Sequence, residues 1–307
     1  MKVLKFGGTS VGSAQRMKEV AKLITDGERK IVVLSAMSGT TNTLVEISDY
    51  LYKKNPEGAN EIINKLESKY RQHIDELFAT PENKQKGLEL IKSHFDYIRS
   101  YTKDLFTLFE EKVVLAQGEL ISTAMMNYYL QECGVKSVLL PALEYMRTDK
   151  NAEPDPVYIK DLPQIQLELH PDAETYITQW SILRNAYGEI DNLQRGGSDY
   201  TASLIGAAIN ASEIQIWTDI DGMHNNDPRI VDKTAPVRHL HFEEAAELAY
   251  FGAKILHPTC IQPAKYANIP VRLLNTMDPT APGTLISNDT EKGKITAVAA
   301  RDDITAI

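Results

Sequence analysis

The chain has 307 residues, 43% hydrophobic and 24% charged, which is enough for one large α/β core or two ordinary ones and excludes a disordered protein. Lys and Arg total 33 against 42 Asp and Glu, a net charge of −9 that argues against a nucleic-acid surface, which needs a basic face. The N-terminus is polar and no apolar run reaches 18 residues, which predicts neither a signal peptide nor a membrane span. The two cysteines, Cys133 and Cys260, form no disulfide framework, so we expect a cytoplasmic protein.

The chain begins with a predicted strand, a pair of glycines and a predicted helix. Val3 and Leu4 favour a strand, and Lys5 follows them at a position that we expect to be buried. Gly7 and Gly8 end the strand. Such a turn offers backbone N–H groups and a helix N-terminus to an anion. The spacing matches neither the G-x-G-x-x-G fingerprint nor the P-loop, which also argues against a dinucleotide-dependent dehydrogenase.

Continuous apolar runs predict four further strands that are buried on both faces, at 30–36, 135–142, 213–220 and 270–275. The resulting alternation of strands and helices predicts an α/β fold with a mostly parallel central sheet sandwiched by helices. Residues 145–165, which are acidic and rich in proline, are expected to form a surface loop or lid.

Two apolar stripes at helical spacing predict a helical insertion over residues 45–112. Such stripes belong to a packed core far more often than to a cofactor site. Their members are Ile62, Ile63, Leu66, Tyr70, Ile74 and Leu77, and then Leu88, Ile91, Phe95, Ile98, Leu105 and Leu108, with Tyr101 beside the second stripe.

A second glycine pair stands before a helix later in the chain. Gly196 and Gly197 precede Ser198, a good N-cap, and Asp199, which suits the positive end of the helix dipole. An ordinary turn with a cap is the alternative. Arg195 favours an anion site, because a guanidinium beside exposed backbone donors binds anions in a bidentate manner.

Two more stretches carry candidate residues, each with an ordinary structural alternative. Thr218 and Asp219 close a predicted strand, where open α/β sheets place ligands, and Arg229 lies in the turn-rich loop that follows, although such a loop can equally be plain solvated surface. Lys254 and His257 follow an alanine-rich helix. They could instead be a surface lysine and a structural histidine after a glycine C-cap.

Glu119 adds a carboxylate at an apolar helix start, where it must be paired or face a ligand. Dispersed lysines, arginines, carboxylates and glycine turns form the inventory that phosphoryl transfer needs, with Mg²⁺ held largely by the phosphates. Neither a Ser-His-Asp nor a Cys-His set competes with this interpretation, and no spaced His and Cys ligands predict zinc.

Six ordered motifs resemble the aspartokinases of the amino-acid kinase family, over residues 1–287. The resemblance implies a catalytic domain at 1–287, with an amino-acid-binding lobe over about 1–195 and a nucleotide-binding lobe over about 196–287. It also implies ATP-dependent phosphorylation of aspartate to 4-phospho-aspartate, the first step towards lysine, threonine and methionine. The motifs are KFGGTS (5–10), VLSAMSGTTN (33–42), QGEL (117–120), RGGSDYTA (195–202), WTDIDGMHNNDPR (217–229) and FGAKILHP (251–258).

The resemblance also implies residue roles. Lys5, Asp199 and Lys254 are the implied catalytic residues, with Lys5 facing the transferring phosphoryl group. The implied aspartate pocket has Arg195 on the α-carboxylate and Glu119 on the ammonium group, and its further members are Ser35, Thr41, Gly196, Gly197 and Ser198. The resemblance implies that Mg²⁺ is held mainly by the phosphates of ATP and not by a protein metal site. His224 stands where the family usually has tyrosine. The implied contacts to ATP are Lys5, Gly7, Gly8, Thr218, Asp219, His224, Arg229 and Lys254.

Two segments depart from the family pattern or extend it. QWSIL (179–183) stands where the family reads Gln-Gly-Phe-Ile-Gly, which leaves open a different acceptor or a catalytically weakened binding or regulatory module. Residues 294–307 resemble the first strand of a regulatory ACT domain. We therefore expect a truncated ACT region at 288–307 and a longer, homo-oligomeric full chain, with fusion to a homoserine dehydrogenase left open.

Overall fold

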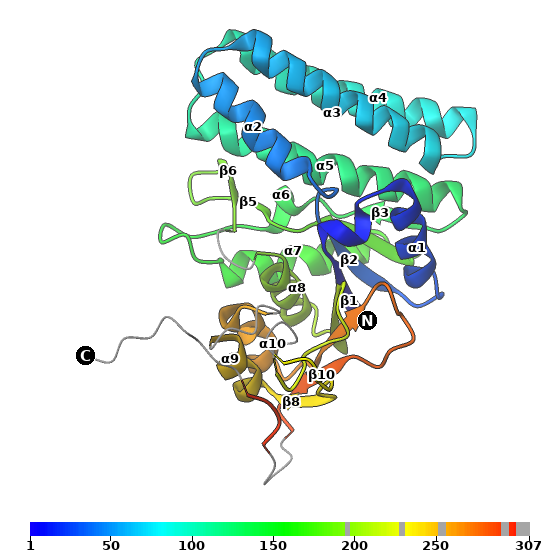
Figure 1. Ribbon diagram of the computed structural model, residues 1–307, viewed down its shortest axis with the longest axis vertical. Coiled ribbons are helices and arrows are strands. Elements are labelled where there is room, and N and C mark those ends of the chain that lie inside the picture. Colours follow the sequence, from blue (N-terminus) through cyan, green and yellow to red (C-terminus); the bar gives the residue numbers. More distant parts are fainter. Residues whose placement is uncertain (194–196, 227–230, 251–255, 290–294, 299–307) are drawn as a thin grey trace.

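The structure, a computed structural model, describes residues 1–193, 197–226, 231–250, 256–289 and 295–298. These residues form an eight-stranded sheet in the order β3-β4-β2-β1-β7-β9-β10-β8 (Figure 1). Every pairing from β3 to β9 is parallel, and β10 runs antiparallel to β9, so the prediction of a mostly parallel sheet between helices is confirmed. The strands are β1 (Lys2–Phe6), β2 (Lys30–Leu34), β3 (Ser137–Leu139), β4 (Thr175–Gln179), β7 (Glu213–Thr218), β8 (His239–His241), β9 (Val271–Asn275) and β10 (Thr284–Ser287).

The four strands predicted from apolar runs correspond to β2, β3, β7 and β9, each somewhat shorter than its run. β4, β8 and β10 were not predicted, and neither was a separate antiparallel hairpin of β5 (Ile182–Arg184) and β6 (Ile190–Asn192). These segments are three to five residues long and carry polar residues, so their apolar signal is weak.

The sheet has a hydrophobic core on each face, because alternate residues of a strand point to opposite sides. On β1, Leu4 and Phe6 join the core beneath α1 (Ala14–Ile24) and the long helices of the first half of the chain, whereas Val3 joins the core beneath α8 (Gly197–Ala208). Lys5 has the same parity as Val3. The alternation therefore places its side chain on the α8 face of the sheet.

Four long helices lie together at one end of the molecule, at the top of Figure 1. They are α2 (Thr40–Tyr52), α3 (Pro56–Leu77), α4 (Pro81–Ser100) and α5 (Leu108–Glu132). The predicted stripes are buried up to Ile98 except for Ile62 and Leu88, which are partly buried against the same core. Leu105 and Leu108 are 74% and 63% exposed, so including them was wrong. The reason is that α4 ends at Ser100 and the chain turns before α5 begins. The bounds of the insertion at 45–112 remain a prediction.

The expected loop or lid at 145–165 is only partly a loop. Residues from Pro156 onward form α7 (Pro156–Leu169), whose N-cap Asp155 accepts hydrogen bonds from the backbone N–H groups of Val157 and Tyr158. Proline at the first helical position fits this start, so the Pro-rich composition marked a helix N-terminus. The remaining helices are η1 (Gly8–Val11), η2 (Tyr101–Lys103), α6 (Ala142–Tyr145), α9 (Phe242–Tyr250), η3 (Pro258–Ile261) and α10 (Gln262–Tyr266).

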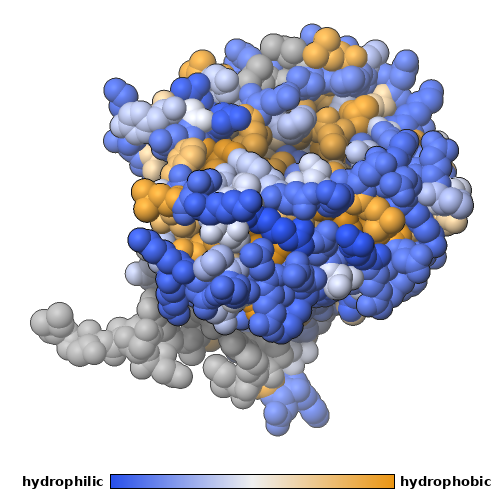
Figure 2. Space-filling view, turned by 90° about the horizontal axis from the view of Figure 1, so that it is seen from above, coloured by the Kyte–Doolittle hydropathy of each residue, from blue (hydrophilic) through white to orange (hydrophobic). Residues whose placement is uncertain are grey.

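Viewed from the end where α3 and α4 lie, the surface is mainly hydrophilic with separate hydrophobic patches (Figure 2). Among the residues that the structure describes, no helix combines the length and the apolar character that crossing a membrane requires. The predicted ACT strand falls mostly on residues 299–307 and 294, which lie outside the described residues. Residues 295–298 belong to no named strand.

Candidate functional site

Several of the candidate residues lie where the strand order reverses. From β1 the chain first adds β2 on one side of the sheet and later adds β7 on the other, so the carboxyl ends of β1 and β7 flank a topological switch point. Open α/β sheets bind ligands in the crevice outside such a point. Because Phe6 pairs with Trp217, the Gly7-Gly8 turn and the Thr218-Asp219 stretch leave neighbouring strand ends.

Lys5 and Asp199 form a buried ion pair at this edge. The Nζ of Lys5 lies 3.2 Å from Oδ1 of Asp199, and the two side chains are 8% and 11% exposed. Asp199 lies in the first turn of α8, as predicted, where the helix dipole favours a negative charge. Ser198 was expected as the N-cap, but the helix already includes Gly197, so Ser198 lies inside the first turn.

The first glycine pair brings the backbone close to Lys5 and to the chain after β2. A Cβ atom on Gly7 would lie 3.8 Å from Nζ of Lys5, so a side chain there would enter the space in front of the ammonium group. A Cβ atom on Gly8 would lie only 3.1 Å from the carbonyl oxygen of Ala36. The backbone of Ser35 is hydrogen-bonded to β1 and to α5. Its N–H donates to the Phe6 carbonyl at 3.3 Å, and its carbonyl accepts from Ser122 Oγ at 2.7 Å.

Glu119 is buried in the middle of α5, not at a helix start as its sequence suggested. Its Oε2 accepts hydrogen bonds from the backbone N–H groups of Trp180 and Ser181, both at 2.9 Å, and its Oε1 accepts from Ser181 Oγ at 2.5 Å. Burial raises the pKa of Glu119, although these hydrogen bonds oppose the shift. The carboxylate is therefore paired, as expected, and its partners are mainly the backbone N–H groups that follow β4.

The segment that departs from the family pattern lies between Glu119 and Lys5. Gln179 ends β4, accepts from the backbone N–H of Ala142 and donates to Thr123 Oγ1, both at 2.8 Å. The next residue, Trp180, places its ring 5.0 Å from Nζ of Lys5, measured to the ring centroid. Sequence reasoning noticed this residue as a departure but missed the contact, because β4 itself had not been predicted.

The other expected residues are placed as follows. The carbonyl of Thr218 accepts from the N–H and Oγ1 of Thr276, at 2.8 and 2.9 Å, while Asp219 is exposed. His224 is half-buried and its Nδ1 is hydrogen-bonded to Thr234 Oγ1 at 2.8 Å, and Thr41 is exposed in the first turn of α2.

Four expected residues, Arg195, Gly196, Arg229 and Lys254, lie outside the described residues, as does the side chain of Ser198. Cys260 lies near the Lys5–Asp199 pair, but burial, with a further contribution from Asp199, raises the pKa of its thiol to about 12. It is therefore a thiol at neutral pH.

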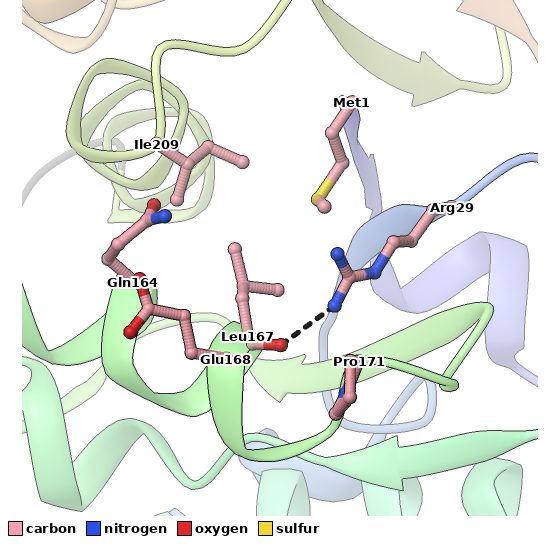
Figure 3. Close-up of a pocket in the computed structure, with 7 residues that line it drawn as sticks. All are labelled: Met1, Arg29, Gln164, Leu167, Glu168, Pro171 and Ile209. Atoms are coloured by element: carbon pink, nitrogen blue, oxygen red, sulfur yellow. Dashed lines mark hydrogen bonds between the residues drawn. The ribbon is translucent and has the colours of Figure 1, made fainter.

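A cavity of about 390 Å³ lies at the opposite edge of the sheet, near the start of β1 and β2 (Figure 3). One of the residues that line it is Arg29, whose guanidinium donates to the Leu167 carbonyl at 2.7 Å and lies over the ring of Tyr176. These contacts satisfy the carboxyl end of α7 and explain Arg29 as a helix cap. The cavity is therefore separate from the residues at the switch point.

The chain matches the Amino acid kinase family over residues 1–275, and it belongs to that family. It is 36% identical to "Aspartokinase 1, chloroplastic" of Arabidopsis thaliana over 99% of this chain and 55% of that protein. It is 34% identical to "Lysine-sensitive aspartokinase 3" of Escherichia coli over 94% of this chain and 64% of that protein. The chain thus spans between about half and two thirds of these curated relatives.

The fold is similar to that of solved aspartokinases. The crystal structure of E. coli aspartokinase III in complex with aspartate and ADP matches with a TM-score of 0.84 and 33% identity, over 95% of this chain and 65% of that one. Aspartate kinase from Clostridium acetobutylicum matches with a TM-score of 0.80 and 25% identity, over 97% and 66%. The resemblance to aspartokinases drawn from the six motifs is therefore confirmed.

Proposed function

We propose that the chain is the catalytic domain of an aspartate kinase, which transfers the γ-phosphoryl group of ATP to the side-chain carboxylate of aspartate. The observation that carries this proposal is the buried Lys5–Asp199 pair at the switch point, next to a glycine pair that keeps the space before the ammonium group open. The similarity to an aspartokinase solved with aspartate and ADP supports the choice of substrates.

The geometry suits a polyphosphate. Lys5 supplies a positive charge fixed by Asp199, and the Gly7-Gly8 turn lets backbone N–H groups approach without a side chain between them. In phosphoryl transfer the protein mainly positions the groups and stabilises negative charge on the transferring oxygens. Because Lys5 is fixed before the substrate arrives, little reorganisation opposes that stabilisation.

Magnesium would accompany the nucleotide. In the described part of the chain no three His, Cys, Asp or Glu side chains gather as a metal site, so phosphate oxygens are proposed as its main ligands, with Asp199 the carboxylate nearest the ammonium of Lys5. When bound, the ion neutralises charge on the phosphates.

The amino-acid side of the site is assigned by the same proposal. Arg195 would bind the α-carboxylate and Glu119 would attract the ammonium group, with Ser35 and Thr41 beside them. Glu119 already accepts three hydrogen bonds from residues 180 and 181, so it also fixes the position of these two residues. Lys254, Arg229, Thr218, Asp219 and His224 are proposed for the nucleotide.

The wider organisation is proposed on the same basis. We infer an amino-acid-binding lobe over about 1–195, a nucleotide-binding lobe over about 196–287 and a cytoplasmic homo-oligomer as the full protein. A second candidate function, a kinase of another amino acid, is favoured by one observation, namely that Trp180 and Ser181 occupy the loop above Glu119.

The test is ATP turnover against a panel of amino acids, with the acyl phosphate trapped by hydroxylamine as a coloured hydroxamate. We expect aspartate to give hydroxamate and the other acids to give little. Lys5→Met should lower the rate of hydroxamate formation a hundredfold or more, since one preorganised contact to the transition state contributes about 3 kcal/mol. Hydroxamate from glutamate or another acid instead would assign the second function, and no turnover with any acid would refute both.

A further inference from the structure

Trp180 is held by contacts on three sides. Its backbone N–H donates to Oε2 of Glu119 at 2.9 Å, and its carbonyl accepts from Oγ1 of Thr201, a residue of α8. Its ring is the third contact, 5.0 Å from Nζ of Lys5. Because both backbone groups are bonded to buried side chains, the point from which the ring projects is fixed by α5 and α8 together.

The ammonium group of Lys5 needs such a restraint. A lysine side chain is a flexible stem with a point charge at its end, and Asp199 alone fixes one of its three N–H directions. The face of an indole ring attracts a cation through its quadrupole and accepts no conventional hydrogen bond from it. The ring therefore restrains the ammonium without adding a second negative charge.

We propose that Trp180 is a positioning residue for Lys5: its ring holds the ammonium group against Asp199 in the direction that the transferring phosphoryl group requires. This inference rests on the proposed function, because it assigns Lys5 to phosphoryl transfer. Trp180 acts through Lys5 and needs no contact with either substrate. Its removal therefore changes the rate of the chemical step more than the binding of ATP or of the acceptor.

The experiment compares Trp180→Phe and Trp180→Leu with the unchanged protein. Phenylalanine keeps a weaker cation–π partner and leucine keeps only apolar bulk. We expect kcat to fall about 3- to 30-fold in Trp180→Leu and less in Trp180→Phe, as expected for a partly buried cation–π contact, with both KM values within about twofold. The matched control is Tyr158→Leu on α7. It removes a ring whose centroid lies 5.0 Å from Cζ of Arg147, and it should leave kcat unchanged.

The result that overturns the proposal is an unchanged kcat in Trp180→Leu, or a loss that is equal in the two variants and follows their melting temperatures. If Trp180→Leu does not fold, Trp180→Phe decides alone, and a kcat equal to that of the unchanged protein refutes the positioning role.

A second measurement separates this inference from the proposed function. In protein labelled with ¹³C-lysine, the Cε–Hε signals of Lys5, assigned by their absence in Lys5→Arg, should show an upfield ring-current shift that Trp180→Phe reduces. This readout needs no acceptor. Absence of the shift refutes the contact even if aspartate is phosphorylated, whereas a missing hydroxamate product in the unchanged protein refutes the proposed function and leaves the shift to decide the contact.

Discussion

Removing one partner of the Lys5–Asp199 pair should destabilise the protein more than removing both. Lys5→Met leaves the Asp199 side chain, which is 11% exposed, without the ammonium group of Lys5, and Asp199→Asn leaves the Lys5 side chain, which is 8% exposed, without the carboxylate of Asp199. The double variant Lys5→Met/Asp199→Asn removes both charges. The coupling between the two sites is therefore measurable by a double-mutant cycle.

The expected size follows from the geometry. At 3.2 Å and an effective dielectric constant of about 20, two unit charges attract each other by about 5 kcal/mol. Part of this attraction is offset by the desolvation of both ions, and losing one partner of a buried pair costs about 3–5 kcal/mol. We therefore expect each single variant to lose about 3 kcal/mol of unfolding free energy and the double variant to lose less than either single variant.

The assay is urea unfolding followed by circular dichroism for the three variants, with a hydroxamate assay on the folded fractions. The control cycle is Lys2→Met with Glu28→Gln, an ion pair at 3.0 Å whose side chains are 37% and 61% exposed and whose coupling should stay below about 1 kcal/mol. Additive losses at Lys5 and Asp199, with a coupling no larger than that of the control, would show that the pair is not electrostatically coupled. All three site variants should lose turnover, because each removes a charge at the site of transfer.

Glu119→Leu should lower the unfolding free energy by about 2–4 kcal/mol, because leucine has no acceptor for the hydrogen bonds of residues 180 and 181, whereas Glu132→Leu, at a more exposed site, should lose less. Burial raises the pKa of Glu119 above its ordinary 4.5, so the folded state retains a proton that the unfolded state releases. The stability that this proton contributes therefore falls as the pH rises from about 4.5 through the folded pKa. The urea midpoint of Glu119→Gln, which has no titrating carboxyl group at this position, should lack this decline. Gly8→Ala should raise the KM for ATP several-fold, as measured by initial rates, because its Cβ would press on the carbonyl of Ala36 at 3.1 Å. Arg195→Ala should raise the KM for aspartate about 10- to 100-fold and leave that for ATP unchanged in the same assay, as expected for a lost bidentate carboxylate contact.

The sheet was predictable where strands are buried on both faces. The run from Lys30 to Leu34 is fully buried between two layers of helices, so hydrophobicity alone marks it. β4 (Thr175–Gln179) is just as buried but reads TYITQ, and its polar side chains Thr178 and Gln179 make internal hydrogen bonds, to Tyr145 and Thr123 respectively. A local pattern cannot show partners that lie more than 50 residues away.

The helical region shows the same limit from the other side. The spacing of apolar residues correctly marked the buried faces of α3 and α4, since a stripe of this kind has to face a core. It could not show that the helix ends at Ser100, because Leu105 and Leu108 happen to continue the spacing after the chain has turned. The end of a helix depends on its cap, and no glycine or proline marks this one.

The two halves of the candidate site differ in how far the sequence determines them. On the phosphoryl side, Lys5 and Asp199 are almost 200 residues apart, yet each stands next to a glycine pair and at an end of a regular element, so each could be recognised locally and the fold brings them to 3.2 Å. On the acceptor side the decisive contacts join Glu119 to the backbone of residues 180 and 181, and backbone donors leave no trace in the sequence. Trp180 links the halves, because its backbone is held by Glu119 and its ring lies over Lys5. A substitution in the acceptor loop should therefore be felt at the phosphoryl end, and kinetics that separate kcat from KM are the measurement that detects it.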